Sequence, residues 1–165
     1  ADFRREPPRE HAAEPWILDQ PVNVMNAPAL LIGCAALLVC IVVQGSTVAL
    51  VMGKLKSRLR GLAVQKRSGM AHLLFFISIL TLLMSHLAQI MIWSWFLYWP
   101  GIMTNPHHAV LLAGSTYTTV GFTNDSLPER WQLLEVIMAV SGLFAFAWST
   151  SIFYGLSQQI YREED

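Results

Sequence analysis

Three long apolar segments constrain the fold of this chain more than any other feature of its sequence. They cover about residues 27–52, 72–99 and 133–154, and the helix of the third can extend to residue 160. A helix needs roughly 20 mostly apolar residues to cross a bilayer, so each segment is long enough. The chain of 165 residues is 54% hydrophobic and only 13% charged, which is too apolar for an ordinary soluble domain. The sequence therefore predicts an all-α membrane protein with three transmembrane helices.

Basic residues between the first two apolar segments predict the orientation of the chain. Segment 53–68 has no acidic residue, and its basic residues are Lys54, Lys56, Arg58, Arg60, Lys66 and Arg67. The positive-inside rule places such a loop in the cytoplasm. It follows that the N-terminal tail 1–24 and the loop 99–131 lie outside, and that the C-terminal tail 161–165 is cytoplasmic. We expect a multi-pass protein of the cell's inner (plasma) membrane.

The two polar segments before and after the first span each allow two interpretations. Leu55, Leu59 and Leu62 recur at helical spacing in the basic segment, which predicts an amphipathic helix on the inner membrane surface. This helix either only sets the topology or acts as a linker that transmits gating force. Its expected partner is lipid headgroups and not nucleic acid. The tail 1–24 mixes charges with Pro, which is typical of a solvated tail and also suits docking to a partner.

A shorter apolar piece, residues 107–117, predicts a helix that enters the membrane without crossing it. Thr104, Asn105 and Pro106 form a helix start, with a capping side chain followed by Pro. A helix from there to Tyr117 is about 18 Å long, roughly half a bilayer. Entering from outside, it ends near the midplane. The negative end of its dipole then stabilises a cation there.

The residues after this helix resemble the selectivity filter of potassium channels, which usually reads Thr-Val-Gly-Tyr/Phe-Gly-Asp. The segment here is Thr118, Thr119, Val120, Gly121, Phe122 and Thr123. In such filters, rings of consecutive backbone carbonyls replace the hydration shell of the ion, and the apolar side chains wedge the strand against its surroundings. Gly provides backbone angles that a Cβ opposes. The resemblance implies K⁺ at Thr119, Val120, Gly121 and Phe122, as a permeant ion and not a cofactor.

The resemblance extends over about residues 70–160, to small bacterial members of the two-helix pore-domain superfamily. It rests on His86-Leu-Ala-Gln89, on the block Ser115 to Phe122, and on Arg130-Trp-Gln-Leu-Leu-Glu135 through Trp148-Ser149-Thr150. It implies a homotetramer in which each subunit supplies an outer helix, a re-entrant pore helix, a filter loop and an inner helix. The segments expected are a tail 1–24, a first transmembrane helix 25–52, a basic linker 53–68, a pore domain 69–160 and a tail 161–165.

Two departures from the family pattern bear on selectivity. Thr123 stands where the family filter has Gly, and Asn124 stands where it has Asp, although Asp125 follows directly. A Cβ at residue 123 disfavours positive φ, so we expect weaker selectivity at the outer end. Besides a potassium-channel-like cation channel, two alternatives stay open. One is a non-conducting, channel-derived subunit of a larger membrane complex, and the other is a weakly selective pore.

Several residues are candidates for supporting the filter. Ser115 stands behind it and can form hydrogen bonds, and Asn124 and Asp125 follow it. Glu135, near the outer end of the third span, is either a brace behind the filter or an interfacial, solvated acid. Gly142 is either a gating hinge or a point of close helix packing.

Polar residues inside the second span also allow two interpretations. His86 and Gln89 share a helix face, with Ser85 beside them, and they either sense protons or form interhelical hydrogen bonds. His72, His107 and His108 lie near the interfaces but do not form a metal site. Cys34 and Cys40 are predicted to be packing residues. The sequence carries no nucleophile–base pair, phosphate loop or metal-ligand spacing, so we expect neither an enzyme nor a cofactor.

Overall fold

The computed structural model describes residues 27–65 and 68–162 of the chain, with side chains for 27–54, 69–70 and 73–158. The described residues form five helical elements and no strand. They are α1 (Ala27–Gln65), α2 (Ser68–Tyr98), α3 (Pro106–Tyr117), the 3₁₀ turn η2 (Glu129–Trp131) and α4 (Gln132–Arg162). The predicted tail 1–24 lies outside this range.

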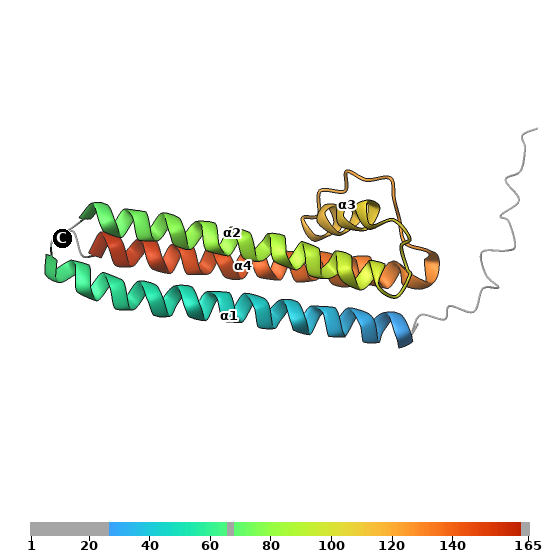
Figure 1. Cartoon of the computed structure of the whole chain (residues 1–165), viewed down its shortest axis with the longest axis horizontal. Helices are drawn as coiled ribbons and strands as arrows, with labels where there is room; N and C mark the ends of the chain where they lie inside the picture. Colours follow the sequence, from blue (N-terminus) through green and yellow to red (C-terminus); the bar gives the residue numbers. More distant parts are fainter. Residues whose placement is uncertain (1–26, 66–67, 163–165) are drawn as a thin grey trace, which may run out of the picture.

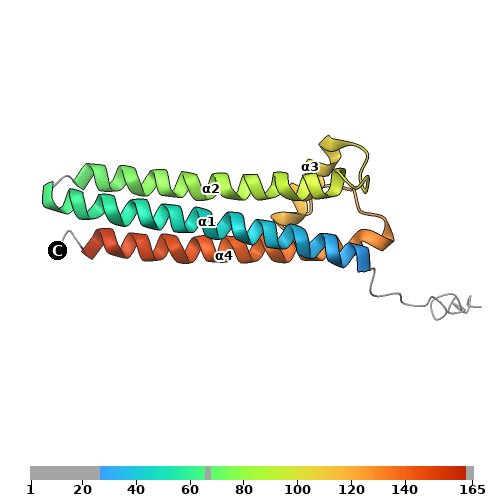
Figure 2. The same cartoon turned by 60° about the horizontal axis from the view of Figure 1, so that its bottom comes forward.

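The three long helices lie side by side along the longest axis of the molecule, and α2 runs opposite to α1 and α4 (Figures 1 and 2). The short helix α3 lies at one end, beside the C-terminal part of α2 and the N-terminal part of α4. This arrangement is the one that three successive membrane crossings produce, with α3 and its loops placed together at one side.

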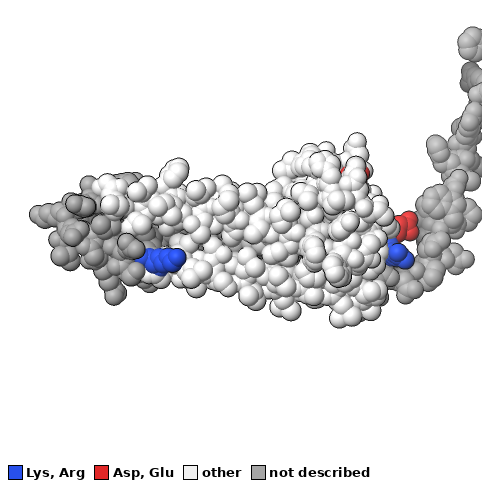
Figure 3. Space-filling model, in the orientation of Figure 1, with Lys and Arg blue, Asp and Glu red and all other residues white. Residues whose placement is uncertain are grey.

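Three helices are long and apolar enough to cross a membrane, as predicted. The qualifying stretches are Ala27–Lys54, Leu73–Tyr98 and Glu129–Gln158. In Figure 3 the described Lys and Arg side chains lie near the two ends of the long axis, with white surface between them. Many large apolar side chains on the three long helices are exposed, such as Leu31, Phe76 and Phe144. A bilayer is the environment that such a surface requires, because it has no charges for water to solvate.

The basic segment differs from the prediction in one respect. Helix α1 continues without a break to Gln65, so the boundary expected between residues 52 and 53 has no structural counterpart. Residues 53–65 therefore extend the first helix and do not begin as a separate surface helix. Lys, Arg, Leu and Ala favour helix, and no Pro interrupts the segment, which explains the continuation. The side chains of residues 55–68 lie outside the description.

The largest buried cluster lies at the α3 end of the molecule. It includes residues from the three long helices and from the short helix α3. Examples are Cys40 of α1, Trp93 of α2, Leu112 of α3 and Met138 of α4. Cys40 is buried, in agreement with its predicted packing role, whereas Cys34 is exposed on α1. This cluster anchors α3 against the bundle, so the loop that follows α3 starts from a firmly packed position.

Candidate functional site

Helix α3 begins and packs as its sequence predicts. The Asn105 side chain accepts a hydrogen bond from the His107 N–H at 2.9 Å, and Pro106 occupies the first helical turn. The cap uses an N–H that has no partner within the helix. Ala109, Leu112 and Tyr117 are buried on the face toward the bundle. The helix is therefore defined at its start by a cap and along its length by burial.

The C-terminal end of α3 approaches the backbone of α4 at Gly142. A Cβ built at Gly142 would collide with the backbone carbonyl of Tyr117. Neither backbone can yield easily, since both belong to packed helices. This contact favours the packing interpretation of Gly142 over the hinge interpretation.

Three successive N–H groups after α3 converge on one residue. The N–H groups of Val120 and Gly121 donate to the Ser115 carbonyl at 3.0 and 3.4 Å, and the Phe122 N–H donates to Ser115 Oγ at 3.0 Å. Ser115 itself is buried. The predicted role of Ser115 behind the loop is thus matched by its hydrogen bonds. The loop is tied to the last turn of α3 through its N–H side.

The backbone angles of the loop orient its carbonyls the other way. Thr119 has φ 59° and Gly121 has φ 66°, so left-handed residues alternate with Val120. No cis peptide bond occurs in the described chain. In a trans peptide, the C=O points opposite to the N–H of the next residue. The carbonyls of Thr119, Val120 and Gly121 therefore face away from α3, on the exposed side of the loop.

Thr119 is unusual because it is β-branched and has positive φ. It is the only non-Gly residue with positive φ in the part of the chain that the structure describes. Such a conformation costs of order 1–3 kcal/mol and persists where the surroundings impose it. Thr123, in contrast, does not adopt positive φ. The alternation therefore ends at Gly121, which agrees with the expectation that a Cβ at residue 123 opposes it.

The apolar side chains of the loop are open in a single chain. Val120 is 67% and Phe122 is 60% exposed. The predicted wedging of these side chains against their surroundings therefore finds no partner surface among the described residues of one copy. Within the described part of one copy, these two apolar side chains and the neighbouring carbonyls therefore have no surface that covers them.

Two contacts secure the chain after residues 118–123, the segment that resembles a filter. Asp125 Oδ2 lies 2.7 Å from His108 Nδ1, which ties the loop to the first half of α3. Glu135 Oε1 accepts a hydrogen bond from the Leu127 N–H at 2.7 Å, which favours its interpretation as a brace. Asn124 is exposed. Of the predicted supports, Ser115, Asp125 and Glu135 therefore hold the loop at three successive places.

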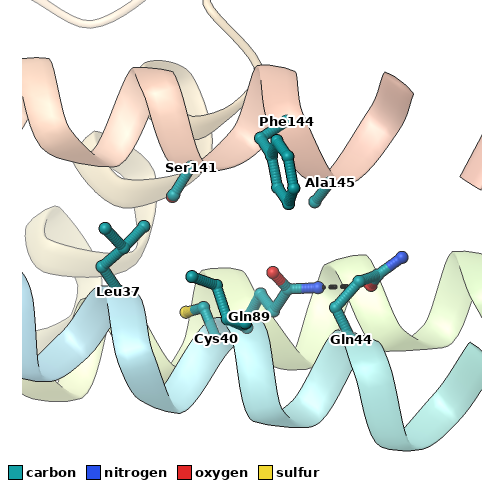
Figure 4. A pocket seen from close by; sticks show the side chains of 8 residues that line it. Leu37, Cys40, Gln44, Gln89, Ser141, Phe144 and Ala145 are labelled. Carbon is teal, nitrogen blue, oxygen red and sulfur yellow. Dashed lines mark hydrogen bonds between the residues drawn. The ribbon is translucent and has the colours of Figure 1, made fainter. Parts of the chain in front are cut away.

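A buried polar network joins helices α1, α2, α3 and α4. Only half of its residues were predicted from the sequence. Gln44 of α1 donates from Nε2 to Ser149 Oγ of α4 at 2.9 Å, and its Oε1 accepts from Gln89 Nε2 at 2.8 Å and Ser85 Oγ at 3.0 Å. Figure 4 shows the hydrogen bond between Gln44 and Gln89 at the wall of a small pocket that Ser141 and Phe144 of α4 also line. The interhelical interpretation of Gln89 and Ser85 agrees with these bonds.

The same network reaches α3 through His86. Its Nδ1 lies 3.0 Å from the Tyr117 hydroxyl, and its Nε2 lies 3.0 Å from Ser149 Oγ. Gln44, Tyr117 and Ser149 were not assigned to a polar network from the sequence. Gln44 carried a signal, since it is the only amide side chain in the first apolar segment. A polar group at membrane depth usually has a partner on another helix.

The remaining candidate residues are the histidines and possible metal ligands. No group of three or more His, Cys, Asp or Glu side chains there could hold a metal ion. His107 and His108 lie together near the start of α3, with ring centroids 6.1 Å apart. The side chain of His72 falls outside the description. Comparisons with protein-family models, with curated proteins and with solved structures give no match for this chain.

Proposed function

We propose that this protein is a subunit of a potassium-channel-like cation channel. Four copies would surround a central axis, and the carbonyls of residues 119–122 would replace the hydration shell of a monovalent cation. Permeation is passive, and no cofactor takes part. The membrane is the inner (plasma) membrane, with the N-terminus outside and the C-terminus in the cytoplasm.

The single observation that carries this proposal is the direction of the loop peptides. The N–H groups of Val120, Gly121 and Phe122 all turn toward Ser115, so the three preceding carbonyls turn toward open space. Each backbone carbonyl is a strong acceptor that needs a partner when it is buried. A row of carbonyls with a common direction is the arrangement that binds a dehydrated cation.

The dipole of α3 supports the same site. The helix ends at Tyr117, directly before the carbonyl row, and has 12 residues. Its C-terminal end carries a partial negative charge of about half an elementary charge. The helix therefore adds to the attraction of a cation at Thr119 and Val120.

Exposure supports the assembly of several copies. Non-helical backbone at membrane depth is tolerated only where protein buries it or where it lines a water-filled cavity. One copy leaves Val120 and Phe122 largely exposed. In the proposed homotetramer, neighbouring copies cover these side chains while the carbonyls line the axis.

Cation flux into liposomes tests the proposal. The purified protein is reconstituted, and flux is measured under a K⁺ gradient and then under a matched Na⁺ gradient. We expect K⁺ flux to exceed Na⁺ flux in the native protein. We expect Gly121→Ala to abolish the K⁺ flux, because Ala at φ 66° costs about 1–2 kcal/mol and disturbs the carbonyl row.

Gly101→Ala is the matched control for this variant. Gly101 also has positive φ, at 72°, and a Cβ there meets no atom within 4 Å, as at Gly121. It lies in the connection between α2 and α3 and not in the filter segment. Loss of flux in both variants would point to general destabilisation, whereas loss in Gly121→Ala alone would assign the effect to the filter.

A weakly selective pore is the second candidate, and the backbone at Thr123 favours it. Without positive φ at this residue, the carbonyl row does not extend as it does in the family filter. Equal fluxes of K⁺ and Na⁺ would support this candidate. No flux of either ion, together with co-purification of a single copy in a hetero-complex, would support the non-conducting subunit.

A further inference from the structure

We propose that Tyr117 and His86 are positioning residues that set the conformation, and with it the selectivity, of the filter segment. The inference rests on the proposed function, since it concerns how the carbonyl row of Thr119 to Gly121 is held. The geometry points to one connection between α2 and this segment. A hydrogen bond from the last residue of α3 to the middle of α2 holds the helix turn that carries Ser115.

Tyr117 is held at two places. Its backbone carbonyl packs against Gly142 of α4, and its hydroxyl lies 3.0 Å from His86 Nδ1 of α2. The residue has no exposed surface in the structure. A side chain held at both its base and its tip cannot rotate without breaking one of these contacts. Tyr117 therefore defines both the depth and the rotation of the end of α3.

His86 is held from the other side. Its Nε2 lies 3.0 Å from Ser149 Oγ, and its ring stacks on Phe146 with centroids 4.3 Å apart. A neutral imidazole has one donor and one acceptor nitrogen, so one of the two hydroxyls donates to the ring and the other accepts. Ser149 also accepts from Gln44 of α1. The position of the imidazole is thus determined by α1 and α4 together.

The filter segment depends on the same turn of α3. Ser115 accepts the N–H groups of Val120, Gly121 and Phe122, and it lies two residues before Tyr117. Residues this close in a helix move together, because the helix repeats every 3.6 residues or so. A rotation of the last turn would displace the Ser115 acceptors and, with them, the three carbonyls that face the open side. Placement of those carbonyls is what discriminates between ions in such a filter.

Tyr117→Phe is the variant that isolates this hydrogen bond. It removes only the hydroxyl oxygen and keeps the ring, including its contact with Phe146 at 5.8 Å between centroids. Ser85→Ala is the matched control. It removes a hydroxyl from the same network, and the two acceptors of this hydroxyl, Gln44 Oε1 and the Leu82 carbonyl, lie on α1 and α2 and not on α3. Ser149→Ala tests the next link, since it removes the partner of His86 Nε2.

The first measurement is hydrogen exchange of the full-length protein in lipid nanodiscs. A lost buried hydrogen bond corresponds to about a 5- to 10-fold change in a local opening equilibrium. We expect the N–H groups of Val120, Gly121 and Phe122 to exchange about that much faster in Tyr117→Phe. Ser149→Ala should produce a smaller change at the same residues, and Ser85→Ala should leave them unchanged. Unchanged exchange in Tyr117→Phe would overturn the proposal, as would equal acceleration in all helices.

The second measurement is the K⁺ to Na⁺ flux ratio in liposomes. We expect the ratio to fall in Tyr117→Phe and to stay at the native value in Ser85→Ala. A conducting native protein with an unchanged ratio in Tyr117→Phe would overturn the role in selectivity. If the native protein conducts no ion and Tyr117→Phe still accelerates exchange in the loop, the positioning role stands and the channel function fails. The two claims are therefore separable.

Discussion

The three-helix bundle and the filter segment are stabilised in opposite ways. In the bundle, side chains of different helices meet in a buried interior, through contacts such as Gln44 with Ser149 and Trp93 with Ser141. In the filter segment, the backbone is held from one side by Ser115, while Val120 and Phe122 remain open. The bundle is complete within one chain. The segment of residues 118–123 lacks such contacts on its open side, which is where the proposed tetramer would place the other copies.

Strain is distributed in the same unequal manner. The left-handed conformations lie outside the long helices, at Gly101, Thr119 and Gly121. Thr119 holds an unfavourable conformation that Gly would adopt freely. A segment that is strained, exposed and anchored by few groups is typical of a site and not of a scaffold. Substitutions in the two regions test whether they differ in this way.

The largest effect is expected where the two regions touch. Gly142→Ala places a Cβ against the Tyr117 carbonyl, so we expect destabilisation of about 3 kcal/mol and displacement of α3. Gly155→Ala is the control on the same helix, because a Cβ there meets no atom within 4 Å. Thermal unfolding in detergent measures both. A Gly142→Ala protein as stable as the native one would show that α3 does not pack as described.

The next effect tests the bundle alone. Gln44→Leu removes a donor to Ser149 and an acceptor for Gln89 and Ser85, so we expect a loss of about 1–3 kcal/mol. Ser46→Ala is its control, since that hydroxyl bonds only to the Val42 carbonyl of its own helix. The measurement is the free energy of unfolding in mixed micelles. A loss confined to Ser46→Ala would contradict the network.

A smaller effect is expected in the filter segment. Ser115→Ala removes the acceptor of the Phe122 N–H but leaves the carbonyl that holds Val120 and Gly121. We expect a loss of about 1 kcal/mol in stability together with a lower K⁺ to Na⁺ flux ratio. Ser78→Ala is the control, because its hydroxyl bonds to the Leu74 carbonyl within α2. An unchanged flux ratio in Ser115→Ala would argue against support from its side chain.

The smallest effect is expected at the surface. His108 and Asp125 form a partly exposed pair at 2.7 Å, and such pairs contribute about 0.2–1 kcal/mol. A double-mutant cycle with His108→Gln and Asp125→Asn measures their coupling, which should weaken as salt concentration rises. A coupling energy well above this range that does not change with salt would contradict this expectation. It would show that the pair is less exposed to solvent than it is in a single chain.

The regular parts of the molecule were predictable from sequence because they follow from length, apolar pattern and caps. The three spans and the helix that starts at Asn105 and Pro106 are present as expected. The continuation of α1 to Gln65 was not predicted, since the change in composition at residue 53 suggested a boundary where the backbone has none. The change from apolar to basic residues indicates where the surroundings of the helix change. It does not indicate where the helix ends.

The contacts between helices were predictable only in part. Ser115 and Glu135 could be identified from their distance along the chain to the filter segment. The pairing of His86 with Tyr117 and Ser149 depends on how four helices rotate against one another, which a single sequence does not specify. The positive φ of Thr119 is likewise hidden, because Thr by itself disfavours it. The first feature arises from helix packing and the second accompanies the hydrogen bonds of the loop to Ser115, and both were visible only in the structure.

Locating the ion would test the proposed pore directly. Crystals of the protein grown with Rb⁺, a K⁺ substitute with measurable anomalous scattering, would be used to calculate an anomalous difference map. We expect peaks in a row beside the carbonyls of Thr119, Val120 and Gly121, on an axis shared by four copies. A map without peaks at these carbonyls, from crystals in which the loop is well ordered, would contradict the proposed channel function.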